Sequence, residues 1–282
     1  IINFNPGSCK KRYDKTLKRK ISSKAPYNTT IVCLTAEETL RFIRKNGFKY
    51  FNRRYVIGYW PWELPRWPKA WIESIDFVNE IWVSTTFIKQ SLNGITNKPI
   101  KVMPLCVDKL ERRIVPQTPS QVVQNRLNFG LDINKKYIIM GFDLNSYIAR
   151  KNPYGALDCF QKAFPLKNKE NYSENVGLVV KTYKSTKINR EWEFFKYLIS
   201  TDKRIVVIEE NMDKEKLLNL FGCCDVYMSL HRSEGFGRCL AESFQLGLDV
   251  LATDWSGNRD YCEGPLYHPV PYKLNPVKPG DY

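Results

Sequence analysis

The sequence has 282 residues, of which 43% are hydrophobic and 26% charged, which is ordinary for a soluble globular protein and enough for two domains. No apolar run of about eighteen residues occurs, which excludes a membrane-spanning helix. The chain does not begin with Met and shows no signal-peptide core, so we expect a fragment or a true start further upstream.

Positive charge is concentrated at the start of the chain. The formal net charge is +15, and the first 60 residues contain fourteen Lys and Arg against three Asp and Glu. Such a surface attracts polyanions, either nucleic acid or an anionic membrane that carries a lipid-linked acceptor, although a basic surface that only faces solvent is the simpler interpretation. No RNA- or DNA-binding motif is present, so we expect no nucleic-acid partner.

The cysteines and histidines predict neither a zinc site nor a disulfide scaffold. Eight cysteines are scattered without a C-x-x-C pair, and only His231 and His268 could join them. Most of the cysteines lie in or beside apolar segments, as they do in reduced cytoplasmic proteins. We therefore expect a cytoplasmic protein.

The first part of the chain predicts a parallel α/β domain. Residues 1–28 are polar and basic and predict no clear element, apart from 10–20, which could be helical. Strands that alternate with helices form a parallel sheet covered on both faces. We predict strands over 29–34 (buried), 54–59, 80–83 and 100–103, and helices over 36–45 (capped by Thr35 and ended at Gly47), 67–78 and 86–92.

A polar interruption separates this part from a second domain of the same kind. Residues 108–131 contain charged LERR, two prolines and several Gln and Asn, and we interpret them as a linker. We therefore divide the chain into residues 1–112 and 113–282. In the second part we predict strands over 137–142, 176–181 and 204–209, and helices over 154–164, 190–199 and 214–221.

The stretch DVYMSLHRSEGFGRCLAESFQLGLDVLATDWSGN, residues 225–258, predicts a strand, a glycine-bracketed loop, a helix and a second strand. The strand spans 226–230, the loop contains Gly-Phe-Gly at 235–237, the helix spans 238–246 and the next strand 250–252. Backbone N–H groups and the helix dipole make the start of such a helix a site for negative charge.

Two carboxylates, Glu234 and Glu242, bracket this loop with seven residues between them. A carboxylate beside a bound phosphate would be repelled, so each Glu is better used to accept hydrogen bonds from hydroxyl groups. A phosphate with sugars at both ends describes a nucleotide sugar. The alternative is a solvent-facing Glu pair around an ordinary strand-to-helix turn.

SEGFGRCLAE resembles the E-x7-E signature of the retaining group 1 (family 4) glycosyltransferases, which have the GT-B fold of two Rossmann-like domains facing a cleft. The resemblance implies that Glu234 contacts the transferred sugar and Glu242 the ribose of the nucleotide. GYWPWELPRWPKAW, EIWVSTTFIKQSL and PLCVD resemble the end of the N-terminal domain. GFDLNSYIARKNPYGALDCFQKAF and LVVKT resemble the donor domain of bacterial enzymes that build surface polysaccharides.

The sequence departs from this family at both ends. The opening strand and glycine-rich loop of the N-terminal domain are missing, so we expect that domain to be incomplete. The chain also stops before the helix that in the family crosses back to the first domain. A piece of this length could transfer sugar slowly or not at all.

The resemblance assigns further residues to the donor. Arg150 and Lys151 match the phosphate-binding basic pair, although a solvated loop pair is the alternative. The earlier Arg of the family is absent, and Lys181 at a strand end could supply its charge. The nucleobase would meet Asn211 and Met212, largely through backbone groups. The loop itself contributes His231, Ser233, Gly235, Phe236 and Gly237, of which His231 could equally be a structural hydrogen-bonding residue.

On the acceptor side, Trp60 could stack on a sugar and Glu63 could bind a hydroxyl, although such a Trp-Pro run is more often core and turn. The resemblance implies retaining transfer of a hexose from a nucleotide-diphosphate sugar to a saccharide or lipid-linked acceptor of cell-surface polysaccharide, lipopolysaccharide or capsule. It implies no metal and no other cofactor, and a same-face route in which Glu234 orients the sugar without attacking it. The enzyme could lie on the inner face of the cytoplasmic membrane.

Three alternatives remain open from the sequence. A GT-B hydrolase or phosphorylase would have the same fold, although we find no motif for a pyridoxal phosphate lysine. A polyanion-binding module would use the basic first part. An inactive glycosyltransferase fragment would keep the fold without the activity.

Overall fold

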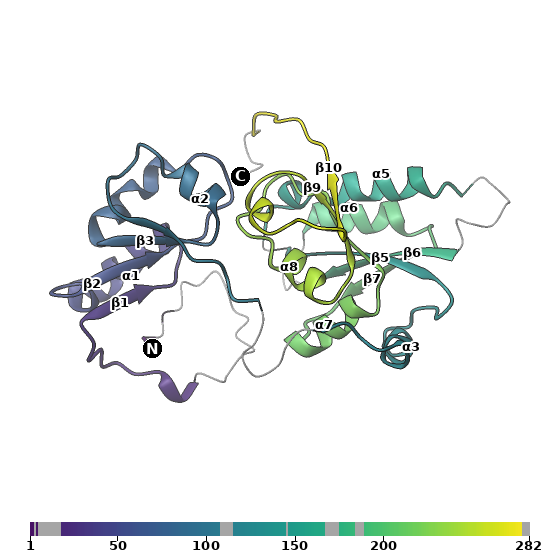
Figure 1. The fold of residues 1–282 in the computed structure, drawn as a ribbon, viewed down its shortest axis with the longest axis horizontal. Coiled ribbons are helices and arrows are strands. Elements are labelled where there is room, and N and C mark those ends of the chain that lie inside the picture. Colours follow the sequence, from purple (N-terminus) through teal and green to yellow (C-terminus); the bar gives the residue numbers. More distant parts are fainter. Residues whose placement is uncertain are drawn as a thin grey trace. The chain divides into compact units, whose positions relative to one another are not determined.

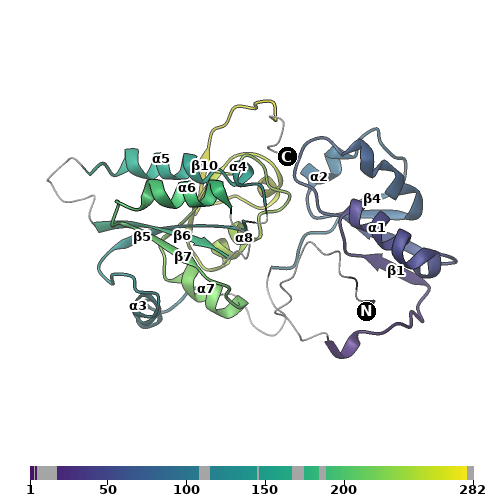
Figure 2. The same cartoon turned by 180° about the vertical axis from the view of Figure 1, so that it is seen from behind.

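The computed structural model describes residues 1, 2, 4, 18–107, 115–144, 146–166, 175–183 and 189–277 (Figures 1 and 2). The chain forms two compact units, Ile1–Leu105 and Cys106–Tyr282, and each is described by itself. The boundary predicted between residues 112 and 113 lies outside the described residues, as does most of 10–20. None of the helices in the described ranges is long and apolar enough to cross a membrane.

The first unit is a four-stranded parallel sheet in the order β1-β2-β3-β4. Its strands are β1 Thr29–Val32, β2 Tyr55–Tyr59, β3 Glu80–Val83 and β4 Ile100–Val102. Its helices are α1 Ala36–Asn46 and α2 Thr86–Ser91, with 3-10 helices at Lys18–Lys20, Gly47–Tyr50 and Lys69–Phe77.

The start of α1 follows the predicted capping. The side chain of Thr35 accepts a hydrogen bond from Glu38 N, and the carboxylate of Glu38 accepts one from Thr35 N, which together form a capping box. Gly47 ends the helix with φ 65°, where a residue with a side chain would be strained. The prediction of this helix is confirmed at both ends.

One prediction in this unit is wrong, and a second is right in position but differs in helix type. The strand expected to be buried over 29–34 is the edge strand Thr29–Val32, in which Val32 is buried but Ile31 is half exposed. The amphipathic helix expected over 67–78 is the 3-10 helix Lys69–Phe77. Lys98 holds its end, since Lys98 Nζ donates to the carbonyls of Ile75 and Val78 at 2.6 Å each.

The second unit is a six-stranded parallel sheet in the order β10-β9-β8-β5-β6-β7. Its strands are β5 Lys136–Phe142, β6 Val176–Thr182, β7 Ile205–Glu209, β8 Val226–Ser229, β9 Asp249–Thr253 and β10 Tyr267–Val270. Its helices are α3 Pro119–Asn128, α4 Ile148–Lys151, α5 Pro153–Ala163, α6 Arg190–Ile199, α7 Lys214–Gly222 and α8 Arg238–Gln245, with a 3-10 helix at Gly257–Asp260.

Both faces of this sheet are covered, as parallel strands require (Figure 1). Successive strand residues point to opposite faces, so Ile139 and Val179 pack on the side of α7 and α8. Met140 and Val180 pack on the side of α5 and α6, where Trp192 is fully enclosed. Two apolar cores therefore hold the sheet rigid between the helices.

The order of the strands reverses between β5 and β8. From β5 the chain builds outward through β6 and β7, and it then returns to the other side of β5 to build β8, β9 and β10. The loops that follow β5 and β8 therefore diverge to opposite faces of the sheet. In parallel sheets the crevice at such a reversal, outside the carboxyl ends of the strands, is the place where ligands bind.

The predicted linker is wrong over its second half. The side chain of Thr118 accepts from Gln121 N, the Gln121 side chain accepts from Thr118 N, and Pro119 begins the helix α3. Buried Arg126 ties α3 to the sheet, since Arg126 Nε donates to the Cys223 carbonyl at 2.9 Å and Nη2 pairs with Asp225. The strand β10 and the short helix α4 were not predicted.

Candidate functional site

The residues that follow β5 and β8 meet at the strand reversal. Arg232 N donates to the Arg150 carbonyl at 2.8 Å, and Asn152 Nδ2 donates to the Leu230 carbonyl at 2.8 Å. Asn152 has the left-handed conformation (φ 51°, ψ 49°) that Asn tolerates, and its side chain caps α5, in which Pro153 is the first residue. This turn holds the basic end of α4 beside the loop after β8.

Glu234 is paired with both cations of that basic end. Arg150 Nη1 lies 3.2 Å from Glu234 Oε2, and Lys151 Nζ pairs with Oε1. The guanidinium of Arg150 also donates to the Ser233 carbonyl at 2.8 Å and to Ser146 Oγ at 2.6 Å. Two positive charges therefore share one carboxylate, and these three side chains together carry a net positive charge.

This environment sets the protonation state of Glu234, which is 8% exposed. Burial alone would raise the pKa of its carboxyl group, but the charges of Lys151 and Arg150 outweigh burial and lower the pKa to about 2. Glu234 is therefore ionised at neutral pH and can only accept hydrogen bonds.

The Gly-Phe-Gly loop leads into α8. Gly237 is the N-cap residue with φ 82°, and as a glycine it has no side chain to cap the N–H groups of the first turn. Tyr261 Oη lies 2.6 Å from the Phe236 carbonyl and 2.7 Å from the Gly237 carbonyl, so these acceptors are turned towards the protein. The predicted arrangement of a glycine loop at a helix N-terminus is present.

Glu242 lies on α8 and is 1% exposed. Its Oε1 pairs with Nζ of Lys214, the first residue of α7. Each carboxylate of the signature therefore pairs with a lysine. Glu234 pairs with Lys151, which follows β5, and Glu242 pairs with Lys214, which follows β7. The sequence did not point to Lys214, because nothing in the sequence links the start of α7 to α8.

His231 is buried, and both of its ring nitrogens lie within hydrogen-bond distance of protein groups. Nε2 lies 3.2 Å from the Trp255 carbonyl and 3.1 Å from Asn258 Oδ1, and Nδ1 lies 3.0 Å from Ser229 Oγ. Nδ1 also lies 3.1 Å from the Ser229 carbonyl, so both ring nitrogens face carbonyl oxygens of the protein. Burial lowers the pKa of His231, which keeps the ring neutral. These contacts match the structural role that the sequence left open.

Three further residues predicted to bind the sugar donor, Lys181, Asn211 and Met212, lie at the end of β6 and after β7. Lys181 is buried, and its Nζ donates at 2.8 Å to the carbonyls of Thr182 and Glu210, which joins the ends of β6 and β7. Met212 packs in the core on the α7 side, whereas Asn211 is exposed.

In the first unit the expectation for Trp60 is wrong. Trp60 is 0% exposed, Nε1 donates to Thr39 Oγ1 at 3.1 Å, and the ring packs 6.0 Å from that of Trp67. It is a core residue that has no face free for a sugar. Glu63 is partly exposed.

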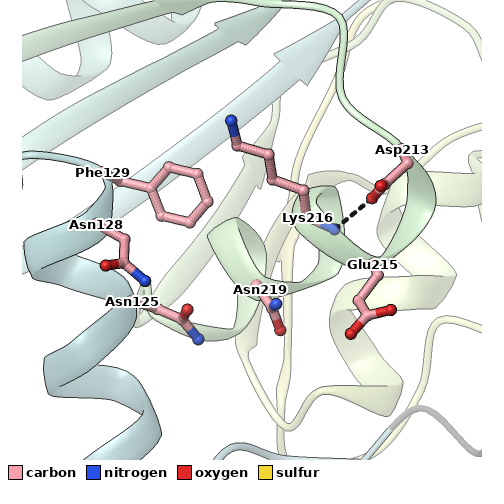
Figure 3. Close-up of a pocket in the computed structure, with 7 residues that line it drawn as sticks. All are labelled: Asn125, Asn128, Phe129, Asp213, Glu215, Lys216 and Asn219. Atoms are coloured by element: carbon pink, nitrogen blue, oxygen red, sulfur yellow. Dashed lines mark hydrogen bonds between the residues drawn. The ribbon is translucent and has the colours of Figure 1, made fainter.

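A separate pocket of about 390 Å³ lies between α3 and α7 (Figure 3). Its wall combines amide, charged and aromatic side chains, and the close-up shows Lys216 N bonded to Asp213 at the start of α7. None of the predicted site residues lines it. The lining residues are Asn125, Asn128, Phe129, Asp213, Glu215, Lys216 and Asn219.

Across the described part of the chain, no three His, Cys, Asp or Glu side chains gather into a group that could hold a metal ion.

Comparison with known proteins identifies the fold. No protein-family profile matches the sequence, and no curated protein matches it. Among solved structures, HepE of Anabaena in complex with UDP and glucose matches with a TM-score of 0.63 at 14% identity, covering 84% of this chain and 62% of HepE. The pneumococcal O-GlcNAc transferase GtfA in complex with UDP and GlcNAc matches with a TM-score of 0.59 at 14% identity, covering 87% of this chain and 46% of GtfA.

WaaG, a glycosyltransferase involved in lipopolysaccharide biosynthesis, matches with a TM-score of 0.59 at 14% identity, over 90% of this chain and 73% of WaaG. The chain thus spans less than two thirds of the length of HepE and of GtfA. Identities this low establish architecture alone. With its two parallel-sheet units, the chain has the GT-B fold.

Proposed function

We propose that the chain is a retaining glycosyltransferase whose second unit binds a nucleotide-diphosphate sugar at the strand reversal between β5 and β8. The observation that carries the proposal is the pairing of Glu234 with Arg150 and Lys151 at this point. The complexes of HepE with UDP and glucose and of GtfA with UDP and GlcNAc, on the same fold, support it.

The cations serve the leaving group. As the glycosidic bond of the donor breaks, negative charge develops on the diphosphate, and fixed positive groups stabilise it. Arg150 and Lys151 supply these charges, and the uncapped N–H groups at the start of α8 add to them. The diphosphate carries more negative charge than one carboxylate, so it displaces Glu234 from the two cations. Because Arg150 and Lys151 supply the counter-charge, we propose transfer without a metal.

Glu234, once displaced, faces the sugar of the donor. An ionised carboxylate accepts hydrogen bonds from sugar hydroxyls and stabilises the positive charge that grows at the ring carbon. The bond from this carbon to the diphosphate oxygen breaks, and the acceptor oxygen bonds to the same face. The proton of the acceptor hydroxyl passes to the departing phosphate oxygen, so Glu234 forms no covalent bond. In this proposal the ribose hydroxyls displace Lys214 from Glu242.

The proposed acceptor is a saccharide or lipid-linked saccharide of cell-surface polysaccharide. WaaG, which acts in lipopolysaccharide biosynthesis, supports this class of acceptor. The basic charge of the first 60 residues supports contact with the anionic inner face of a cytoplasmic membrane. A saccharide acceptor would meet the first unit, where Glu63 is the remaining candidate contact.

A thermal-shift screen tests the proposal. UDP, GDP, ADP and dTDP are added with and without EDTA, each alone and as its hexose sugar, and a single-stranded DNA oligonucleotide serves as the polyanion control. One diphosphate at about a hundred times its Kd is expected to raise the midpoint by roughly 4 °C or more, with EDTA making no difference. A shift with DNA and none with any diphosphate would contradict the proposal and favour a polyanion-binding module.

A further inference from the structure

Ser256, in the turn after β9, has a backbone conformation that is rare for any residue except glycine. Its φ is 78° and its ψ is −150°. Asn152, which also has a positive φ, lies in the ordinary left-handed region with ψ 49°. Ser256 lies instead in the region that glycine alone occupies without strain. A strained residue persists only where its surroundings fix it.

The side chain of Ser256 is directed at the backbone of Glu234. Ser256 is 4% exposed, and its Oγ accepts a hydrogen bond from Glu234 N at 2.8 Å. The next residue, Gly257, donates its N–H to the Glu234 carbonyl at 2.8 Å. Two consecutive residues of one turn therefore hold both backbone polar groups of Glu234.

In this turn one position, Gly257, must be glycine, whereas the strained position before it is occupied by serine. A Cβ on Gly257 would lie 2.0 Å from the Gly235 carbonyl oxygen, so only glycine fits there. No such approach applies at Ser256, where glycine would relieve the strain but would remove the hydroxyl. The buried N–H of Glu234 would then lose its acceptor. The strained serine therefore provides a contact that the relaxed residue could not.

Hydrogen bonds of Asn258 and His231 hold the turn that contains Ser256. Asn258 is fully buried, its Nδ2 donates to the Thr253 carbonyl at 3.0 Å, and its Oδ1 faces His231 Nε2. His231 Nε2 also lies 3.2 Å from the Trp255 carbonyl. These bonds fix the backbone on both sides of Ser256, which explains how its conformation is maintained.

We propose that Ser256 is a positioning residue that holds the backbone of Glu234 and thereby aims its carboxylate at Arg150 and Lys151 and, in the donor complex, at the transferred sugar. The last part rests on the proposed function. Loss of the hydroxyl leaves the two cations and the start of α8 in place, so diphosphate binding survives while the sugar is no longer oriented.

The test compares Ser256→Gly, which relieves the strain, with Ser256→Ala, which keeps it. Ser91→Ala is the control, because Ser91 is also buried and bonds through Oγ to a carbonyl, that of Ile88 in α2. The measurements are the thermal midpoint, hydrogen exchange of the Glu234 amide, the NMR titration of the Glu234 carboxyl, the affinity for UDP or for the diphosphate that the screen identifies, and kcat.

Both Ser256 variants are expected to exchange the Glu234 amide about tenfold faster or more, because its acceptor is gone. Ser256→Gly is expected to melt at or above Ser256→Ala, to bind the diphosphate within about threefold of wild type and to lose kcat by roughly tenfold to a hundredfold. In both variants the pKa of Glu234 is expected to rise from about 2 as the carboxylate leaves its cations.

An unchanged Glu234 amide and carboxyl titration in Ser256→Gly would overturn the proposal, as would a kcat loss no larger than that of Ser91→Ala at equal midpoint. If the wild-type chain transfers no sugar from any donor, the proposed function fails. The amide exchange and the carboxyl titration then still decide whether Ser256 positions Glu234.

Discussion

Arg150 and Glu234 join the two diverging loops of the second unit. Arg150 Nη1 lies 3.2 Å from Glu234 Oε2 and also donates to the carbonyl of Ser233, the residue before Glu234. One buried guanidinium thus fixes both the backbone and the carboxylate at the point where the strand order reverses. The contact places two cations and one carboxylate where a parallel sheet binds its ligand.

Glu234→Gln is expected to separate binding from transfer. The substitution removes the carboxylate that competes with a diphosphate for Arg150 and Lys151, so UDP is expected to bind about fivefold tighter, as titration calorimetry would measure. Transfer is expected to fall by roughly a hundredfold or more, because the growing charge on the sugar loses its partner. The exposed Glu193→Gln on α6 is the control. Full activity in Glu234→Gln would remove the proposed role.

Lys151→Gln is expected to weaken the binding of the diphosphate. Loss of one of the two cations at the strand reversal is expected to raise the Kd for UDP by about tenfold or more. Lys162→Gln is the matched control, because Lys162 is an exposed lysine on α5 that pairs with Asp158 one turn away. Equal Kd values for the two variants would place the diphosphate elsewhere.

The charge of Glu234 predicts how the stability of the protein depends on pH. The pKa of its carboxyl is about 2 in the folded protein and 4.5 in the absence of the fold. A carboxyl group with a lowered pKa stabilises the fold at pH values above its pKa in the unfolded chain. This contribution is lost as the pH falls towards the pKa of the group in the folded protein. The free energy of unfolding of wild type, measured in urea, is therefore expected to approach that of Glu234→Gln as the pH falls from about 4.5 towards 2. A difference that stays constant over this range would show that Glu234 is not held in its ionised form.

Gly257→Ala is expected to destabilise the second unit and to disturb the Glu234 loop. The added Cβ would overlap the Gly235 carbonyl, which cannot move without breaking the bond between Gly257 N and the Glu234 carbonyl. We expect a loss of about 2 kcal/mol or more in the free energy of unfolding. Gly141→Ala is the control, since its Cβ would lie 3.5 Å from the Phe221 ring, an ordinary contact. Unfolding curves of Gly257→Ala that match those of the control would contradict this account of the turn.

The regular elements could be predicted because their signals are local. The strand β3 and the helix α6 have the predicted bounds, since apolar spacing marks both elements and the side chain of Asn189 caps the start of α6. The helix α3 was missed although Thr118, Pro119 and Gln121 form a capping signal, because the Pro, Gln and Asn content of the surrounding residues is typical of a linker.

The site could be predicted only where residues act within one segment. Glu234 and the glycines of its loop stand together in the sequence, and Arg150 and Lys151 were identified through a family resemblance. The contacts of Ser256 with Glu234 and of Lys214 with Glu242 arise from the order of the strands, which brings separate turns together. Trp60 was misassigned because a Trp-Pro run does not reveal whether its ring faces the core or the solvent.

A crystal structure of the chain with bound UDP, or with the diphosphate that the screen identifies, tests the central claim most directly. The account predicts that the diphosphate lies at the start of α8, with its oxygens within about 3 Å of Lys151 Nζ and of the Arg150 guanidinium. Glu234 is then released from both cations. A nucleotide bound elsewhere, such as the pocket between α3 and α7, with Glu234 still paired to Arg150 and Lys151, would contradict it.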